Sequence, residues 1–153
     1  MDPVIRSFTG PNRFLSNFWP SMVKAADGME LPTVEHAYQY EKFIGHWPTL
    51  KEPRELVKAA KTPGQAKKVA EACKHLLPTD WHDRKLDVMR RLLSQKFRQG
   101  SLLGKQLRDT GSVMLVEGNT WGDVYWGICK GHGENWLGRL LMEIRKGLQE
   151  DDA

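Results

Sequence analysis

Three polar residues of this chain have the types and the spacing to do chemistry together. Glu35, Gln39 and Lys42 follow one another at i, i+4 and i+7, and in a helix this spacing places all three side chains on one face. A carboxylate, an amide and an amine on one face can bind a polar substrate and cleave it. The same spacing also occurs on solvent-exposed helix faces that carry a weak Glu/Lys pair, and on the spacing alone this second interpretation is favoured.

The residues around this stripe predict the helix that must position it. Thr33 is a suitable N-cap for such a helix. Val34, Ala37 and Tyr38 can cover its apolar side, and Gly45 is a typical residue to end it. We therefore expect a helix that begins after Thr33 and ends near Gly45.

The rest of the chain predicts a mainly helical α+β fold with a few short strands. A hairpin is expected at residues 22–25 and 29–31, because an Asp-Gly pair lies between two short runs. Helices are expected at residues 54–60, 65–74, 81–97, 102–110 and 135–148, and strands at 4–8 and 113–117. A loop or irregular strand is expected at 13–19, a loop at 46–53, a glycine-rich turn at 118–122, a strand or loop at 123–127, and a frayed acidic tail at 149–153. With no repeat and no long linker, residues 1–153 are expected to form a single domain whose core spans about 8–148.

Composition and charge limit the classes of function. The net charge of +4 suits a phosphate-bearing ligand or nucleic acid without identifying either, and Lys67, Lys68 and Lys74 are expected to form an ordinary solvated face. The two cysteines have no Cys/His spacing, so we expect neither a disulfide framework nor a metal, and no cofactor is indicated. No run has membrane-spanning length and the N-terminus has no signal-peptide pattern, so we expect a cytoplasmic monomer that contacts no membrane.

The available side chains favour acid–base or nucleophilic chemistry. The sequence contains no P-loop and no nucleophile-elbow motif, which leaves Glu35, Lys42 and a second candidate acid, Asp123. A carboxyl group beside an aromatic wall can have a raised pKa and act as general acid or base in cleaving a glycosidic bond. A desolvated lysine can instead attack a ring-opened ribose and form an imine. The sequence does not choose between these two routes.

Aromatic and loop residues supply candidate substrate contacts. Trp81 stands at a helix start, ahead of a Leu/Met stripe that can fill the core, and we expect it to be a pocket wall. Ser16 and Asn17 lie between Phe14 and Phe18, which would anchor the loop while the two polar side chains face a pocket. A turn-forming role for Asn17 is the alternative.

Four ordered groups of residues resemble the NADAR family, which is also called YbiA-like. The groups are Phe14-Leu15-Ser16-Asn17-Phe18, then Pro32-Thr33-Val34-Glu35-His36 with Gln39 and Lys42-Phe43, then Trp81, and finally Tyr125-Trp126-Gly127 with Asn135-Trp136-Leu137-Gly138. The resemblance covers about residues 8–144 and implies a single YbiA-like domain.

The resemblance also implies a reaction. Members of this family are N-glycosidases that act on ribosyl compounds, and in each case the C1–N bond of a ribose 5-phosphate unit is broken. Some cleave ribosylamino-pyrimidine phosphates of the riboflavin pathway, and others remove ADP-ribose from guanine bases in nucleic acid. A non-catalytic module that binds ADP-ribose or NAD is the alternative, and the intact Glu35/Lys42 pair favours the enzyme.

Roles for single residues follow from the same resemblance. It implies that Glu35, Lys42, Trp81 and Asp123 occupy active-site positions, and that Asn17, Gln39, Trp126 and Asn135 are further substrate contacts. The segment between Tyr125 and Asn135 varies in length in the family, so the role of Asp123 could belong to Asp109 or Glu117. His36 belongs to the motif but is expected on a different helix face, so it ranks below Glu35.

Overall fold

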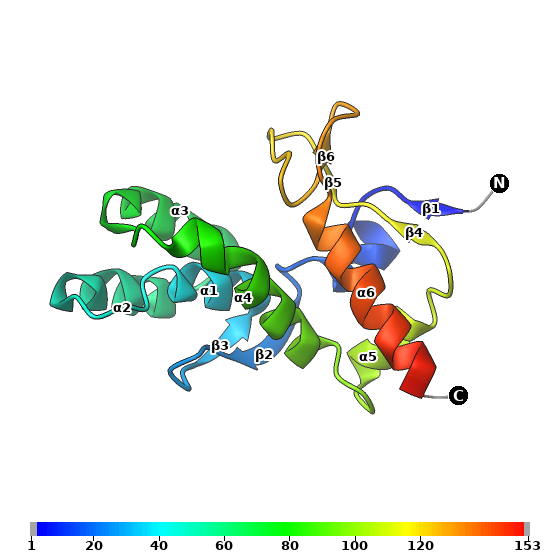
Figure 1. Cartoon of the computed structure of the whole chain (residues 1–153), viewed down its shortest axis with the longest axis horizontal. Coiled ribbons are helices and arrows are strands. Elements are labelled where there is room, and N and C mark those ends of the chain that lie inside the picture. The colour runs from blue at the N-terminus through cyan, green and yellow to red at the C-terminus, as the bar shows by residue number, and fades with distance from the viewer. Residues whose placement is uncertain (1–2, 152–153) are drawn as a thin grey trace. The chain divides into compact units, whose positions relative to one another are not determined.

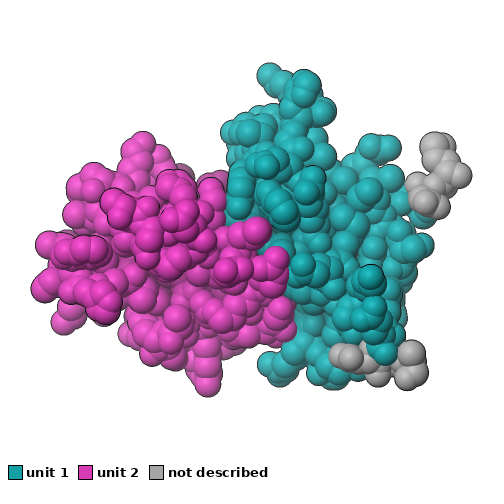
Figure 2. All heavy atoms as spheres, viewed as in Figure 1, with its two compact units in different colours: residues 1–16, 97–153 teal, residues 17–96 magenta. Residues whose placement is uncertain are grey.

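The computed structural model describes residues 3–151, which form two compact units (Figure 2). Unit 2 is the continuous segment Asn17–Lys96, and unit 1 combines the residues before it with those after it. Helices predominate and the strands pair two by two (Figure 1), which confirms the predicted mainly helical α+β class. The prediction of a single domain stays a prediction.

Unit 2 begins with the predicted hairpin. Strands β2 (Pro20–Lys24) and β3 (Glu30–Thr33) pair antiparallel, with Val23 opposite Leu31. Gly28 takes the positive φ of 90° that the turn requires. Because β3 ends at Thr33, the hairpin leads directly into the next helix and fixes where that helix starts.

Helix α1 (Val34–Glu41) lies at the centre of unit 2. It packs against α2 (Lys51–Ala59), α3 (Pro63–Ala72) and α4 (Trp81–Lys96) (Figure 1). All eight of its residues are buried, including Glu35, His36 and Gln39. The interpretation of the polar stripe as a solvent-exposed face is therefore wrong. Buried polar groups are costly unless they find partners, so each polar residue of α1 needs one.

Of the next two helices of unit 2, α3 begins two residues before its predicted start at residue 65, and α4 begins where predicted. Thr62 caps α3 by accepting a hydrogen bond from the Gln65 backbone N–H at 3.1 Å, and α4 begins at Trp81 as expected. Ala66 and Ala70 of α3 are buried together with Ala37 of α1, and these small side chains let the two helices approach closely. Leu92 and Leu93 of α4 add to the core.

Unit 1 is built around the last helix. Helix α6 (Trp136–Asp151) packs against α5 (Leu102–Arg108) and against strand β4 (Met114–Leu115). β4 pairs in parallel with β1 (Val4–Ile5), and β5 (Gly118–Asn119) pairs in parallel with β6 (Ile128–Cys129). The buried side chains of α6 include Leu137, Leu140, Leu141 and Leu148.

Several element boundaries differ from the sequence predictions for local reasons. Residues Gly10–Leu15 form a 3-10 helix with a proline in its first turn. This helix overlaps the start of the segment 13–19, for which no helix was expected. α1 ends at Glu41 rather than near Gly45, because Phe43 and Ile44 donate to the carbonyls three residues earlier and tighten the chain. α2 begins at Lys51, since Pro53 lies in its first turn, where a missing N–H removes no helical bond.

The C-terminal end also differs from the prediction. α6 continues to Asp151, where the sequence predicted a helix end near residue 148 and a frayed tail. The Gln149 side chain donates to the Gly111 carbonyl at 2.9 Å and so anchors the last turns. Residues 152 and 153 of the predicted tail lie outside the described residues. The predicted strands at 4–8 and 113–117 are present but shorter. Of the helices in residues 3–151, none has the length and apolarity needed to cross a bilayer.

Candidate active site

Glu35 lies in the first turn of α1 and is held from two sides. Its backbone N–H donates to the Asn17 carbonyl at 3.1 Å. Its Oε1 accepts a hydrogen bond of 2.8 Å from Nε2 of Gln39, one helical turn later. The predicted i, i+4 neighbourhood of these two side chains is therefore present, but inside the protein.

Burial determines the acidity of Glu35. The residue is only 8% exposed, and burial raises the pKa of its carboxyl group. The Gln39 hydrogen bond and the charges of Lys67, Lys42 and His36 act in the opposite direction but do not cancel this effect. A carboxyl group that keeps its proton to higher pH is suited to donate it in a reaction.

Lys42 follows α1 directly and keeps helical backbone angles, with φ −54° and ψ −31°. Its Nζ lies 5.2 Å from the centroid of the Tyr38 ring. Burial lowers the pKa of Lys42, against the attraction of Glu35 and Glu71, and the charges of Lys67 and Lys85 lower it further. A larger share of this amine is therefore neutral than for an exposed lysine, which is the form that attacks a carbonyl carbon.

Trp81 packs against Tyr38 inside the protein rather than lying on an open surface. The two rings have centroids 5.3 Å apart and are tilted by 57°, and the Arg84 guanidinium lies 5.2 Å from the Trp81 ring. Trp81 is only 2% exposed. The structure thus places it in the core, in contact with Tyr38, and its predicted role as a pocket wall stays a prediction.

His36 has a structural position. Its ring joins the side-chain oxygen of Thr33, at 2.8 Å from Nδ1, to the carbonyl of Ala60, at 2.9 Å from Nε2. Thr33 also caps α1 by accepting from the His36 backbone N–H at 3.0 Å. Because both ring nitrogens are engaged, His36 ties the start of α1 to the end of α2.

Asn17 is buried beside Glu35, and Ser16 belongs to unit 1. The side-chain amide of Asn17 donates to the sulfur of Met89 at 3.6 Å, and the residue is 7% exposed. Ser16 is half-buried and its backbone N–H donates to the Arg13 carbonyl. The predicted roles of both as substrate contacts stay predictions.

In unit 1, Asp123 is fixed by its own loop. Its Oδ1 accepts hydrogen bonds from the backbone N–H groups of Tyr125, at 3.1 Å, and Trp126, at 2.9 Å. Asn119 holds the loop from the other side, since its Oδ1 accepts from the Asp123 N–H and its Nδ2 donates to the Asp123 carbonyl. The Tyr125 and Trp126 rings meet edge to face, with centroids 4.8 Å apart.

Asn135 uses both ends of its amide to hold backbone. Oδ1 accepts from the Glu117 N–H and Nδ2 donates to the Leu115 carbonyl, each at 2.9 Å. Its φ of 55° is a left-handed conformation that asparagine tolerates better than most residues. This geometry favours a structural role over the predicted substrate contact.

The alternatives to Asp123 have other partners. Asp109 is exposed and pairs with Lys105 at 2.8 Å, and the hydrogen bond from Lys105 holds the pKa of its carboxyl low. Glu117 accepts a hydrogen bond from Asn119. It also lies so close to Gly127 that any side chain at that position would collide with it. Asp123 is also held by hydrogen bonds, so these contacts do not decide among the three acids, and Asp123 stays the first candidate because the family resemblance implies it.

The structure brings the predicted residues together in two groups. Unit 2 contains Asn17, Glu35, Gln39, Lys42 and Trp81 around α1, and unit 1 contains Asp123, Trp126 and Asn135 in one loop region. The sequence placed Tyr38 only on the apolar side of the helix and did not predict its contact with Lys42. It also did not predict that the charges of Lys67 and Glu71 act on the pKa values of the site residues. The i, i+4 spacing of Lys67 and Glu71 on a helix next to α1 was the signal that could have found them.

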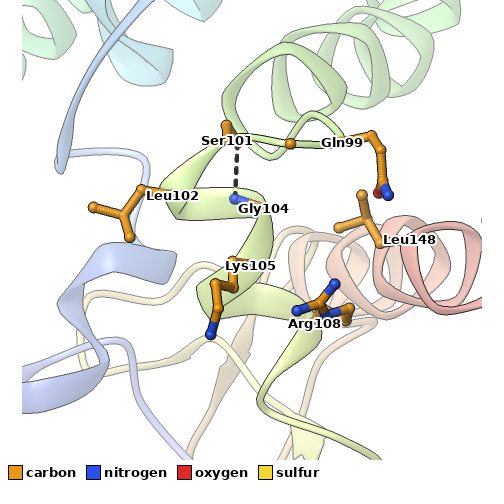
Figure 3. Close-up of a pocket in the computed structure, with 8 residues that line it drawn as sticks. Gln99, Ser101, Leu102, Gly104, Lys105, Arg108 and Leu148 are labelled. Carbon is orange, nitrogen blue, oxygen red and sulfur yellow. Dashed lines mark hydrogen bonds between the residues drawn. The ribbon is translucent and has the colours of Figure 1, made fainter. Parts of the chain in front are cut away.

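A pocket of about 230 Å³ lies elsewhere, within unit 1 (Figure 3). It surrounds the start of α5, where the Gly104 N–H donates to the Ser101 hydroxyl oxygen. The nearby cations Lys105 and Arg108 both contact the carboxylate of Asp109. The pocket contains none of the predicted site residues.

The fold and the candidate site together describe a mainly helical α+β protein in which a buried carboxyl group of raised pKa and an amine of lowered pKa belong to one helix and the residue that follows it. The family model of the NADAR domain matches residues 6–149. The N-glycosidase YbiA of Escherichia coli is 38% identical over 136 residues, which is 87% of this chain and 79% of that protein. The chain therefore belongs to the NADAR family, and the predicted family is confirmed.

Other relatives match this chain at similar identity and differ in length. The N-glycosidase Npun_R5314 of Nostoc punctiforme is 34% identical over 91% of this chain and 87% of its own length. The riboflavin biosynthesis protein VVA0006 of Vibrio vulnificus is 36% identical over 90% of this chain, but this match spans only 36% of that longer protein. The match to the maize riboflavin biosynthesis protein PYRR spans 22% of its length. The NMR structure of E. coli YbiA superposes with a TM-score of 0.82 at 33% identity, covering 99% of this chain and 88% of that one.

Proposed function

We propose that this protein is an N-glycosidase that hydrolyses the bond between C1 of ribose 5-phosphate and an amine nitrogen. The observation that carries the proposal is the buried Glu35 carboxyl group, which is oriented by Gln39 and has a raised pKa. An amine is a poor leaving group until it is protonated, and a carboxyl group whose pKa is raised by burial can supply that proton. Relatives of this length are named N-glycosidases, which supports the same reaction.

Two routes are compatible with these side chains. In direct hydrolysis, Glu35 protonates the nitrogen, the electron pair of the C1–N bond moves to that nitrogen, and water adds to the oxocarbenium-like carbon. The carboxylate then takes a proton from the added water. In the covalent route, the neutral amine of Lys42 adds to C1 of the ring-opened sugar. The substrate's own amine then leaves as Lys42 forms an imine with C1, and water hydrolyses that imine.

The charge of unit 2 supports a phosphate-bearing substrate. Its residues include 14 Lys and Arg against 10 Asp and Glu, so the excess in this segment equals the +4 of the whole chain. Because the names of VVA0006 and PYRR refer to riboflavin biosynthesis, we infer a ribosylamino-pyrimidine phosphate as the first candidate substrate.

A second candidate is ADP-ribose attached to a guanine base of nucleic acid. It contains the same kind of C1–N bond, and the positive charge of unit 2 also suits a nucleic-acid strand. A module that only binds ADP-ribose or NAD would need a pocket but no acid with a raised pKa, so the state of Glu35 favours the enzyme.

Incubation of the purified protein with each substrate tests the proposal. Release of the free aminopyrimidine and ribose 5-phosphate, or of ADP-ribose from modified guanine DNA, is followed by mass spectrometry. The proposal expects turnover of at least one compound, with the spontaneous reaction subtracted. Tight binding of ADP-ribose without turnover of either compound would instead identify a binding module.

A further inference from the structure

Only one half of the Gln39 amide has a partner. Nε2 donates to Glu35, whereas Oε1 is buried and has no hydrogen-bond partner within residues 3–151. The residue is 3% exposed. A buried acceptor without a donor is destabilising, so an oxygen of this kind in a native protein needs an explanation.

The orientation of the amide follows from Glu35. Turning the amide would remove the Nε2 donor from Oε1 of Glu35 and place the oxygen of Gln39 against that carboxyl oxygen, so that two oxygens would face each other. The unpartnered oxygen is therefore a consequence of how Gln39 orients the acid.

A second acceptor of the same kind flanks Glu35. Oδ1 of Asn17 is also buried and has no hydrogen-bond partner in the described part of the chain. The Asn17 carbonyl accepts from the Glu35 N–H, so this residue borders the acid through its backbone. Two buried acceptors without donors, on two residues that each hydrogen-bond to Glu35, suit a ligand that carries several hydrogen-bond donors, such as a sugar.

We propose that Oε1 of Gln39 accepts a hydrogen bond from the hydroxyl group on C2 of the ribose. This inference rests on the proposed function. The oxygen belongs to the amide that contacts the proton donor Glu35, and the C2 hydroxyl is the sugar donor nearest to the C1–N bond. As C1 gains positive charge in the transition state, a bond to this hydroxyl strengthens. Gln39 is thus a specificity-determining residue that favours ribosyl over 2-deoxyribosyl substrates.

The test compares two substrates that differ in one hydroxyl group. The ribosyl and 2-deoxyribosyl forms of one aminopyrimidine 5-phosphate are hydrolysed by the protein, and each kcat/KM is divided by the spontaneous rate of the same compound. We expect the wild type to favour the ribosyl form by about 10–100-fold, the range of one well-placed hydrogen bond. Gln39→Met, which has a similar shape without polar atoms, should reduce this preference to about twofold or less.

Matched variants separate this role from the orientation of Glu35. Loss of orientation alone would slow both compounds equally and leave their ratio unchanged. Gln39→Glu, which keeps an acceptor oxygen, should preserve the ratio even where it changes the rate. Gln65→Met, at an exposed glutamine of α3, should change neither the rate nor the ratio between the two substrates. A wild-type ratio near one, or a ratio that persists in Gln39→Met, would overturn the inference.

Product binding distinguishes failure of this inference from failure of the proposed function. Ribose 5-phosphate and 2-deoxyribose 5-phosphate are titrated into the wild type and into Gln39→Met by calorimetry. If neither substrate is turned over, the proposed N-glycosidase fails. A preference for ribose 5-phosphate that is lost in Gln39→Met would still support the contact, and equal binding of the two sugars by the wild type would refute it.

Discussion

At the scale of single residues, the burial of Glu35 couples its acid chemistry to stability. Burial raises its pKa above the ordinary 4.5, so between pH 4.5 and the raised value the folded protein binds more protons than the unfolded chain. The free energy of unfolding therefore falls as pH rises through this interval. Glu35→Gln removes the titration, and we expect the variant to gain stability over the wild type as pH rises.

Urea unfolding at a series of pH values measures this coupling. The stability difference between Glu35→Gln and wild type should be smallest below pH 4.5 and should grow toward neutral pH. Glu55→Gln, at an exposed position of α2, serves as the control for the loss of one carboxylate. A difference for Glu35→Gln that grows toward low pH would contradict the raised pKa.

Lys42 separates the two chemical routes. If it forms an imine, borohydride added during turnover should trap an adduct that maps to Lys42, and Lys42→Arg should be inactive because arginine does not form the imine. If Lys42 only provides positive charge, Lys42→Arg should keep part of the activity and no adduct should appear. A fully active Lys42→Ala would remove the residue from the site.

At the scale of elements, the start of α4 supports the end of α1 through Trp81 and Tyr38. From the sequence, Trp81 is expected to be a pocket wall. Because Trp81 is 2% exposed, we now expect Trp81→Ala to lower the free energy of unfolding by about 3–5 kcal/mol. Trp47→Ala, at a 60% exposed tryptophan, should cost far less in the same denaturant titration. Equal effects of the two changes would contradict the buried position of Trp81.

Local signals in the sequence predicted most elements but not their ends. Thr33 and Thr62 cap helices with their own side chains, and the Asp-Gly turn depends only on the backbone conformation of its own residues. Features of this kind can be predicted from a few consecutive residues. The end of α1 at Glu41 and the continuation of α6 to Asp151 depend on bonds to distant or tightened backbone. Such contacts have no local signature.

The candidate site was predicted only in part, for a similar reason. Spacing placed Glu35 beside Gln39, and the structure confirms that contact. The same spacing favoured an exposed face, because it carries no information on the helices that cover α1. The burial of Trp81 and the engagement of both ends of the Asn135 amide also arise from residues far along the chain.

At the scale of the whole molecule, the segment Asn17–Lys96 has a net charge equal to the +4 of the whole chain, and the same segment contains Glu35 and Lys42. If this charge attracts the substrate phosphate, salt should screen it. We expect KM for a ribosylamino-pyrimidine phosphate to rise several-fold between about 0.05 and 0.5 M KCl, while kcat changes little. The matched dephosphorylated ribosyl compound should show almost no salt dependence. Equal salt dependence for both compounds would argue against recognition of the phosphate.

The most direct test of the central claim is the rate of C1–N cleavage in Glu35→Gln, measured as release of free aminopyrimidine from its ribosyl 5-phosphate. Glutamine keeps the shape and the neighbour Gln39 but has no proton to give. The account predicts a loss of kcat on the order of 10²–10⁴, with a folded variant and with full activity in the control Glu55→Gln. Near-normal turnover by folded Glu35→Gln would contradict it.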